Sequence, residues 1–263
     1  MGTNDADRTG DQDGRNTIKA VDTSLSIVEA LKRERTAKVS ELAQLTGHSK
    51  ANVYKHLNTL KAQGFVERDD DEFRLGLGYL DLGGLVREQL EGQHIIKPKI
   101  AEIADKTEEV AQYMVESNGK SVIVFKEVGH QGVSLRTRVG AQLPIHQVAS
   151  GKAMLAFMPD TRVDEIVQRH GLPAATENTI TDTEALKDEL AEIRERGYAT
   201  NRSESTKKLF AVSVPVMSVS ENVIGACTVS GPTHRMNDTG KTSQVVETLR
   251  SVTNEIELNL AHS

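Results

Sequence analysis

Two short helical segments in tandem, each opened by a serine and closed by a glycine, constrain the fold of this chain most strongly. The first begins at Ser40 and ends at Gly47, and the second begins at Ser49 and ends at Gly64. A serine hydroxyl can accept from an unpaired backbone N–H at a helix start, and glycine tolerates the left-handed conformation in which helices often end. The short connection between the two segments predicts a helix-turn-helix pair.

A further helical pattern precedes this pair. Four apolar residues recur at intervals of four, three and three, the spacing that lines one face of a helix. These residues are Val21, Leu25, Val28 and Leu31. We therefore expect a first helix from about Ile18, with these four residues on its buried face.

A hairpin pattern follows the pair. Residues 65–68 and 73–75 read as two strands around the acidic turn Asp69–Glu72. Three helices and a hairpin make a winged helix-turn-helix, to which we assign residues 17–77. Residues 1–16 are polar and acidic, and we expect them to form a disordered tail.

The outward face of the third helix has side chains of the types that bind DNA. Its stripe of Val53, Leu57 and Leu60 leaves a face of small and polar side chains, and no carboxylate occurs from His48 to Lys61 in a chain of net charge −6. Lysine donates to guanine edges or phosphates, and asparagine pairs with adenine. An isolated face of this kind is often only solvated, but the neighbouring helix and hairpin favour DNA binding. The predicted contacts are Ser49, Lys50, Ala51, Asn52, Tyr54, Lys55 and Asn58 on the helix, with Arg68 and Arg74 on the wing.

The next segment is too apolar for a solvated linker. Residues 77–90 hold Leu80, Leu82, Leu85, Val86 and Leu90 around a pair of glycines. We interpret residues 78–94 as a linker helix that also dimerises the protein.

The remainder, residues 95–263, alternates helical and strand patterns. We expect strands at 110–115, 122–125, 133–139, 211–217 and 223–230, and helices near 96–104, 151–157, after Asp160, from a cap at Thr181 to Gly197, and at 241–260. The short loop Ser218–Asn222 suits an antiparallel hairpin. These features predict an α+β chain: a winged helix-turn-helix, a linker helix, and an antiparallel-sheet domain of the GAF/PAS-like sensor type.

Several functional classes are excluded or disfavoured. No apolar run approaches the roughly 18 residues of a membrane-spanning helix, and the polar N-terminus lacks a signal peptide's pattern. With Cys227 as the only cysteine, an intrachain disulfide and a multi-cysteine metal site are excluded. We therefore expect a cytoplasmic protein that does not bind membranes.

Catalytic and metal motifs are weak. The string Ser150–Ala153 resembles part of a phosphate loop but has His146 where that motif needs glycine and Ala153 where it needs serine or threonine. Ser150, Lys152 and His146 lack the strand-turn-helix elbow of a nucleophile. The histidines at 130, 146, 170 and 234 are unclustered. We predict no catalytic residue, no metal site and no cofactor.

The ordered motifs resemble the IclR family of transcriptional regulators. The run AKVSELAQLTGHSKANVYKHLNTLKAQGFVERDDDEFRLGLGYLDLG, from Ala37 to Gly83, is similar to that family's DNA-binding region. The runs VGAQLPIHQVASGKAMLAFMP from Val139, IRERGYATNRSE from Ile193 and VSVPV with IGACTVSGP from Val212 are similar to its effector domain. The resemblance covers residues 18 to 260.

The resemblance also implies an effector site. Thr228 and Ser230 share one face of a strand and match positions that hold a small carboxylate-bearing effector in relatives. Ser150 and Gly151, at a helix start, and Asn201 are placed around the same cavity; a structural turn and a polar strand face are the alternative. This chain departs from the family by Lys208 in place of glycine and Asn201 in place of aspartate. Both departures make the site less negative, which favours an effector more anionic or bulkier than glyoxylate or pyruvate.

We therefore expect a sequence-specific regulator whose binding to a palindromic operator in double-stranded DNA is modulated by a small metabolite, an organic acid. A homodimer is expected from the linker helix, and the resemblance implies a tetramer of two dimers. A metabolic enzyme with an accessory DNA-binding module is the main alternative, and a winged helix that binds protein is another.

Overall fold

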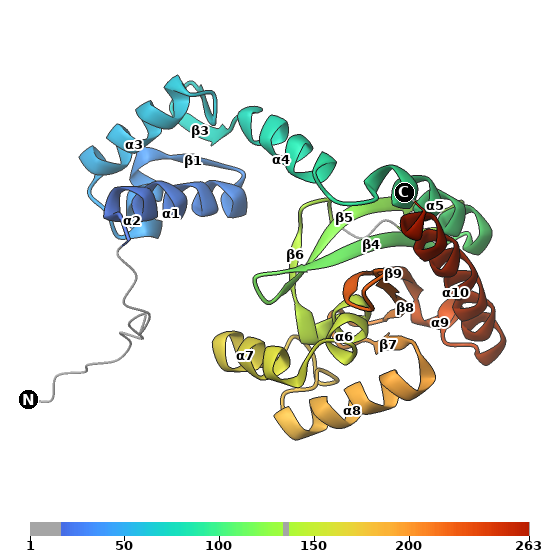
Figure 1. The fold of residues 1–263 in the computed structure, drawn as a ribbon. Coiled ribbons are helices and arrows are strands. Elements are labelled where there is room, and N and C mark those ends of the chain that lie inside the picture. Colours follow the sequence, from blue (N-terminus) through green and yellow to red (C-terminus); the bar gives the residue numbers. More distant parts are fainter. Residues whose placement is uncertain (1–16, 134–136, 263) are drawn as a thin grey trace, which may run out of the picture. The chain divides into compact units, whose positions relative to one another are not determined.

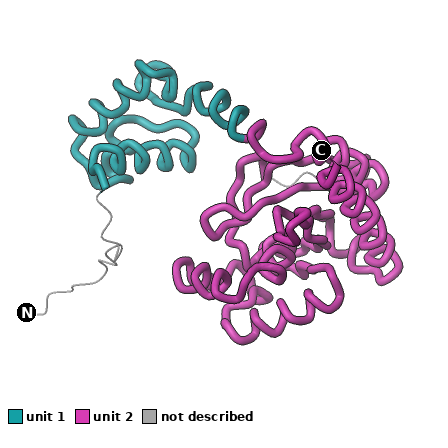
Figure 2. Tube along the Cα trace, in the orientation of Figure 1, with its two compact units in different colours: residues 1–86 teal, residues 87–263 magenta. Residues whose placement is uncertain are grey.

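The computed structural model describes residues 17–133 and 137–262 and divides the chain into two compact units. The N-terminal unit ends at Val86 and the C-terminal unit begins at Arg87, as Figure 2 shows by colour. The division falls within helix α4 (Gly78–Glu88). The predicted tail, residues 1–16, lies outside the described residues.

The N-terminal unit is a winged helix-turn-helix (Figure 1). Its elements are α1 (Lys19–Glu34), β1 (Thr36–Lys38), α2 (Val39–Thr46), α3 (Lys50–Ala62), β2 (Val66–Asp69), β3 (Glu72–Leu75) and α4. The strands form an antiparallel sheet in the order β1-β3-β2. The predicted hairpin is confirmed, whereas β1 was not predicted because three residues give no period.

The predicted buried face of α1 is right at Leu31 and wrong at Val21 and Leu25. Ile27 and Leu31 are buried against α2 and α3, while Val21 and Leu25 are more than half exposed. Two adjacent stripes of this helix have helical spacing, and spacing alone does not say which one meets the core. The core of the unit comprises Ile27, Ala30, Leu31, Ala37, Leu42, Val53, Leu57, Val66 and Phe73.

The helix ends follow the sequence in part. Ser49 caps α3 by accepting from the backbone N–H of Asn52 (3.3 Å), and Gly47 ends α2 in a left-handed conformation. The expected cap at Ser40 is wrong, because α2 begins at Val39 and its N-cap residue is Lys38. Glu41 accepts there from the backbone N–H of Lys38 (2.8 Å).

The C-terminal unit is built on an antiparallel sheet. Within the described residues it has six strands in the order β6-β5-β4-β9-β8-β7. The strands are β4 (Val110–Ser117), β5 (Lys120–Val128), β6 (Gln142–Pro144), β7 (Ala199–Arg202), β8 (Leu209–Met217) and β9 (Val223–Pro232). The helices are α5 (Gln93–Thr107), the 3₁₀ turn η1 (Ile145–Gln147), α6 (Ala149–Ala156), α7 (Asp160–His170), α8 (Thr183–Arg196), α9 (Thr233–Met236) and α10 (Thr239–Ala261).

Each face of this sheet has its own apolar core (Figure 1). Helices α5 and α10 cover one face, where Ile103 and Leu249 are fully buried among strand residues. Helix α6 packs on the other face, with α8 behind it. The predicted α+β class, an antiparallel sheet with helices over it, is confirmed.

Three expectations for this unit need correction. The cap of α8 is Asp182, whose carboxylate accepts from the N–H of Ala185 (2.9 Å), and not Thr181. Residues 134–136 of the expected strand 133–139 lie outside the described residues, and the described residues on either side of them are not strand. Strands β6 and β7 and helix α9 were not predicted, because each has at most four residues.

Candidate nucleic-acid interface and effector cavity

The predicted DNA-contact residues of α3 lie at its surface. Val53 and Leu57 are fully buried in the core, so the opposite face of the helix points outward. Ser49, Lys50, Ala51, Tyr54, Lys55 and Asn58 are exposed, and Asn52 is half-buried. The helix therefore presents the residues expected to read DNA while its apolar stripe anchors it.

Both arginines of the wing contact other residues of the same hairpin. Arg68 donates from Nε to the backbone carbonyl of Asp70 (2.6 Å), and its guanidinium lies over the ring of Phe73. Arg74 pairs with Glu67 across the hairpin (3.0 Å). Both arginines are exposed, so each remains accessible to a phosphate.

The acidic wing tip is partly neutralised from within the unit. Lys38 lies 2.8 Å from the carboxylate of Asp71. The hydrogen bond from this lysine lowers the pKa of Asp71 below its ordinary value. Asp70, also at the tip, is exposed in a left-handed conformation (φ 51°).

The C-terminal unit encloses a cavity of about 450 Å³ between the sheet, α6 and the loop after β7. Thr228, Ser230, Ser150 and Asn201, predicted from separate parts of the sequence, all line it. The other lining residues are Gln112, Met114, Thr137, Leu143, Gln147, Val148, Ala149, Ser205, Thr206, Leu209 and Ala211.

The floor of the cavity is a polar row across three strands. Gln112 of β4 pairs in register with Thr228 of β9, which pairs with Ser213 of β8. The hydroxyls of Thr228 and Ser213 are 2.8 Å apart, and Ser213 also donates to the carbonyl of Cys227 (3.0 Å). Ser230 lies one step along β9, and among the described residues its hydroxyl has no hydrogen-bond partner.

Helix α6 brings Ser150 to the cavity and uses Gly151 for packing. The Ser150 hydroxyl is buried, 3.0 Å from both the Ser121 hydroxyl and Met114 Sδ. A Cβ on Gly151 would lie 1.8 Å from the carbonyl oxygen of Ile145. Gly151 is not among the described lining residues, and its role in the structure is the close approach of α6 to η1.

Asn201 is engaged in holding the loop that closes the cavity. Its Nδ2 donates to the carbonyl of Gln147 (2.6 Å) and to the Ser205 hydroxyl (3.1 Å), and its Oδ1 accepts from the N–H of Glu204 (2.9 Å). The departure at Lys208 falls where φ is +64°, a conformation that glycine adopts more readily.

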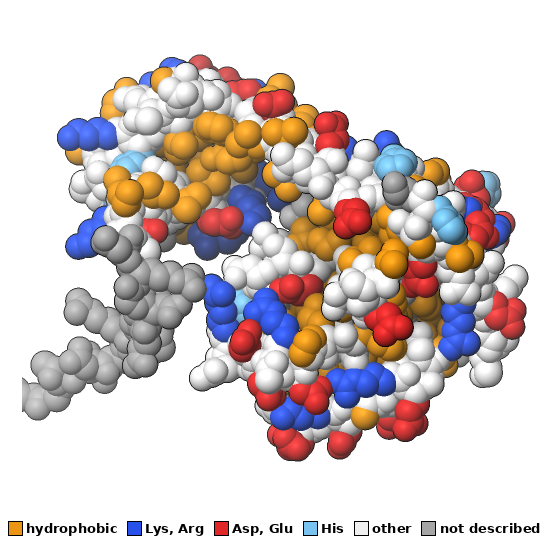
Figure 3. All heavy atoms as spheres, viewed as in Figure 1, with side chains coloured by type: hydrophobic (Ala, Val, Ile, Leu, Met, Phe, Trp, Pro, Cys, Tyr) orange, Lys and Arg blue, Asp and Glu red, His pale blue; other side chains and the backbone are white. Residues whose placement is uncertain are grey.

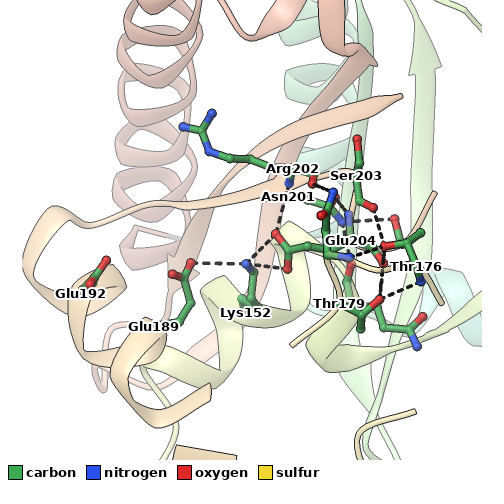
Figure 4. Close-up of polar contacts among 12 residues, drawn as sticks. Lys152, Thr176, Thr179, Glu189, Glu192, Asn201, Arg202, Ser203 and Glu204 are labelled. Carbon is green, nitrogen blue, oxygen red and sulfur yellow. Dashed lines mark hydrogen bonds and ion pairs between the residues drawn. The ribbon is translucent and has the colours of Figure 1, made fainter. Parts of the chain in front are cut away.

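A buried ion pair fixes the same loop to α6 (Figure 4). Lys152 is 2% exposed, and its Nζ lies 2.8 Å from the Glu204 carboxylate and 3.3 Å from that of Glu189. The hydroxyls of Thr176 and Thr179 donate to the backbone carbonyl of Glu204 (3.2 and 2.7 Å). Lys152 is therefore a structural cation, held by two carboxylates and enclosed.

The turn η1 separates this cavity from a smaller one of about 150 Å³. Gln147 lines the larger cavity and His146 the smaller one, and both side chains reach the carbonyl of Pro173 (2.7 and 3.1 Å). Burial lowers the pKa of His146 below its ordinary value.

The described residues give little support for a metal site, a reactive thiol or a membrane-spanning helix. They contain no cluster of three or more histidine, cysteine, aspartate or glutamate side chains that could hold a metal ion. Cys227 is a buried core residue, and this burial raises the pKa of its thiol to about 12. No helix in the described ranges has the length and apolar character needed to cross a membrane.

Comparison with protein families gives a match in each of the two units. The family described as "Bacterial transcriptional regulator IclR C-terminal" matches residues 86–258. The "IclR helix-turn-helix domain" matches residues 20–70. The chain belongs to the IclR family of transcriptional regulators.

Relatives within the IclR family align over nearly the full length. The probable HTH-type transcriptional regulator ArcR of Halobacterium salinarum is 26% identical, with 92% of this chain and 94% of the relative covered. The crystal structure of the Thermotoga maritima IclR superposes with a TM-score of 0.72 at 28% identity, covering 92% of this chain and 97% of that one. An IclR homologue from Microbacterium hydrocarbonoxydans, solved in complex with 4-hydroxybenzoate, has a TM-score of 0.77 at 25% identity and covers 93% and 100%.

Sequence reasoning missed most of the cavity wall. Gln112 and Met114 alternate along β4 on the cavity face, and Leu209 and Ala211 do so along β8. The signal was Gln112, an amide side chain in the buried first part of β4. Leu143 lies on the three-residue strand β6, Gln147 on the three-residue turn η1 and Thr206 in the loop after β7, and segments this short have no period that would indicate a direction.

Proposed function

We propose that this IclR-family regulator binds a palindromic operator as a homodimer or as a tetramer of two dimers, and that a small organic acid in the C-terminal cavity modulates binding. The cavity supports this proposal, since it has a volume in the usual range for ligand sites and is lined by both polar and apolar groups.

The DNA contact is assigned to α3. Its exposed residues include Lys50, Lys55 and Asn58, which suit the major groove, and its N-terminus at Ser49 favours a phosphate. Lys55 replaced by alanine should weaken operator binding by about 1–3 kcal/mol if it reads a base, or reduce the salt slope by about one if it meets a phosphate. An operator selected from random duplexes, titrated at several salt concentrations, tests this, and unchanged affinity and slope would remove Lys55 from the interface.

Dimerisation is assigned to the exposed apolar side chains of the N-terminal unit. Leu77, Leu80, Leu82, Leu85 and Val86 are all exposed on or beside α4, and Figure 3 shows hydrophobic side chains gathered on the visible face of this unit. Contiguous apolar patches on a soluble protein mark interaction surfaces. Two copies joined here would present two α3 helices to the half-sites of a palindrome.

Replacing Leu80 with glutamate should therefore lower both self-association and operator affinity. Sedimentation of the wild type and the variant measures the first, and the operator titration measures the second. A wild-type chain that is monomeric at micromolar concentration with full operator affinity would contradict the assembly.

The effector assignment rests on the cavity and on one relative. The homologue solved with 4-hydroxybenzoate shows that a family member holds a small aromatic acid. In this chain, Thr228, Ser230 and Ser150 are among the hydroxyl-bearing residues that line the cavity. An acid bound there would bias the relative orientation of the subunits, and hence the spacing of the paired α3 helices.

Effector binding is tested by thermal unfolding with a panel of organic acids. Ligands that bind the folded state raise the melting temperature. Acids that do so should also change operator affinity, and Thr228→Val should weaken both effects. A melting shift that Thr228→Val leaves unchanged would place the ligand elsewhere.

We further propose that the protein has no catalytic activity and acts in the cytoplasm. Lys152, the nearest candidate for a base beside Ser150, is paired with Glu204 and Glu189. Turnover of small acids or phosphate esters by the purified chain would favour the alternative of an enzyme with an accessory DNA-binding module.

A further inference from the structure

Among the described residues, three amide side chains line the effector cavity, and two of them are engaged in holding the structure. Gln147 donates from Nε2 to the Pro173 carbonyl (2.7 Å), and Asn201 makes the three hydrogen bonds that hold the closing loop. Gln112 of β4 is buried to a similar degree, with 8% of its surface exposed against 7% for Gln147. Within the described part of the chain, the side chain of Gln112 has no hydrogen-bond partner.

Strand β4 turns Gln112 toward the cavity. Its chain neighbours Ala111 and Tyr113 belong to the apolar core under α5 and α10, so Gln112 stands on the opposite face of the sheet. On that face the next residues along β4 are Val110 and Met114, both apolar and buried. A buried amide without a partner is costly, because folding has removed the water that would bind it. The stability of the fold therefore does not account for a glutamine at this position.

A second buried polar group without a partner lies beside Gln112. Gln112 pairs in register with Thr228 of β9, and Ser230, two residues farther along β9, is its diagonal neighbour on the same face. Diagonal neighbours on antiparallel strands lie roughly 7–8 Å apart, which a long side chain can span. Ser230 is 6% exposed, whereas the Thr228 hydroxyl is already 2.8 Å from that of Ser213.

An amide and a hydroxyl side by side suit a neutral ligand group that both donates and accepts. The glutamine amide offers a donor at Nε2 and an acceptor at Oε1, and the serine hydroxyl can act as either. A ligand hydroxyl between them can accept from one and donate to the other. A methyl group in its place would leave both protein groups without water and without a partner. Sites of this kind discriminate strongly against the apolar analogue for that reason.

We propose that Gln112, together with Ser230, binds a hydroxyl group of the effector and is a specificity-determining residue of the cavity. This inference rests on the proposed function. It narrows the effector class from small organic acids to hydroxy acids. An acid of the same shape that carries a methyl group in place of the hydroxyl is the ligand that the cavity discriminates against.

Pairs of acids that differ by a hydroxyl in place of a methyl group test this selection. 4-Hydroxybenzoate is compared with 4-methylbenzoate, and mandelate with 2-phenylpropanoate, so the hydroxyl lies far from the carboxylate in one pair and beside it in the other. Binding is measured by calorimetry on the full chain. The wild type should bind the hydroxy acid of at least one pair about 5- to 100-fold more tightly than its methyl analogue, the range for leaving a buried polar group unpaired.

Gln112→Met replaces the amide with an apolar group of similar size. It should bring the two affinities of that pair within about two-fold of each other, because the hydroxy acid loses a hydrogen bond and the methyl acid no longer desolvates an amide. Gln142→Met is the matched control, since it makes the same change at an exposed glutamine of β6 in the same sheet. The control should keep the wild-type preference for the hydroxy acid.

The ligand-free chain provides a second measurement. Gln112→Met should leave the melting temperature unchanged or raise it, because it removes a buried amide that has no partner. Gln147→Met should lower the melting temperature, because it removes the hydrogen bond to the Pro173 carbonyl. A fall in Gln112→Met as large as that in Gln147→Met would show that the Gln112 amide supports the fold, and would overturn the proposal.

The remaining outcomes separate this inference from the proposed function. Equal binding of both members of each pair by the wild type, or a preference for the hydroxy acid that persists in Gln112→Met, would overturn the role of Gln112. A wild-type chain that binds its selected operator but neither hydroxy acid at millimolar concentration overturns the hydroxy-acid class and leaves a DNA-binding regulator. A chain that binds neither an operator nor any of these acids overturns the proposed function itself.

Discussion

The two units of this regulator differ in which side chains they expose and which they bury. The N-terminal unit leaves large apolar residues at its surface, with Leu77, Leu80 and Ile18 exposed by 73%, 71% and 68%. The C-terminal unit encloses charged groups such as Lys152, Glu204 and Glu109, and pairs each of them.

The difference follows from size and has functional consequences. A small unit with a three-stranded sheet buries a smaller fraction of its surface, so part of its apolar content remains for a partner. A sheet with helices on both faces has an interior large enough to hold paired charges and a ligand cavity. The first unit therefore works through its surfaces, and the second through its interior.

The largest effect should come from breaking a pair in that interior. Lys152→Met leaves the buried Glu204 carboxylate without its cation, and loss of one partner of a buried pair typically costs about 3–5 kcal/mol. We expect the free energy of unfolding, measured by urea denaturation, to fall by about 3 kcal/mol.

The control for this change is a pair at the surface of the same unit. Lys187 lies 3.1 Å from Asp164, with both side chains largely exposed. Lys187→Met should cost less than about 1 kcal/mol, as exposed pairs do. Equal effects of the two substitutions would show that Lys152 is not held as the structure has it.

Alanine in place of glycine should act in opposite directions in the two units. A Cβ at residue 151 would collide with the carbonyl of Ile145, and this is backbone that must shift. Gly151→Ala should destabilise the C-terminal unit by about 1–3 kcal/mol or more. At Gly83 in α4 nothing lies within 4 Å of the added carbon, and Gly83→Ala should stabilise that helix by about 0.5–1 kcal/mol. Destabilisation by Gly83→Ala would indicate that a partner packs closely on α4.

A smaller effect should appear on acidification. The folded state lowers the pKa of His146, so below about pH 6.5 the unfolded state binds the proton more readily and the free energy of unfolding falls. This contribution is complete above that pH and is lost as the pH falls. His146→Gln keeps a donor for the Pro173 carbonyl but does not titrate. The free energy of unfolding should therefore fall more in the wild type than in the variant as the pH drops below about 6.5. An equal fall in both proteins would show that other groups account for the loss and would contradict the role given to His146.

Sequence alone predicts those parts of this chain whose signal is local. The cap at Ser49, the left-handed ends at Gly47 and Gly197, and the hairpin of β8 and β9 depend on residues close in sequence, and each is confirmed. The buried stripe of α1 depends on which neighbours it meets, and that prediction was wrong at Val21 and Leu25. Leu25 and Ile27 are equally apolar, and only the packing of α2 and α3 distinguishes them.

The effector cavity shows the same limit. Ser150, Asn201, Thr228 and Ser230 were placed together by family resemblance, and the structure brings them to one cavity. Lys126 of β5 pairs in register with Gln112 of β4. The sheet face to which its side chain points could not be predicted, because it depends on a one-residue β-bulge between β4 and β5. Polar residues such as Gln112 signal a site within a strand, but the opposing strands determine what lies beside them.

The smallest effect should come from the wing, where the surface of the N-terminal unit is acidic. Asp70 is exposed at the hairpin tip, and its left-handed φ of 51° suits asparagine, so Asp70→Asn removes a charge without straining the turn. Asp71 is less suitable because it pairs with Lys38. If the tip lies near phosphates, the variant should bind the selected operator about two-fold more tightly at low salt, with a smaller gain at high salt because ions screen the repulsion. Its preference among operator sequences should be unchanged. Loss of that preference, with non-specific binding retained, would show that the acidic tip accepts from cytosine amino groups and that the wing reads sequence.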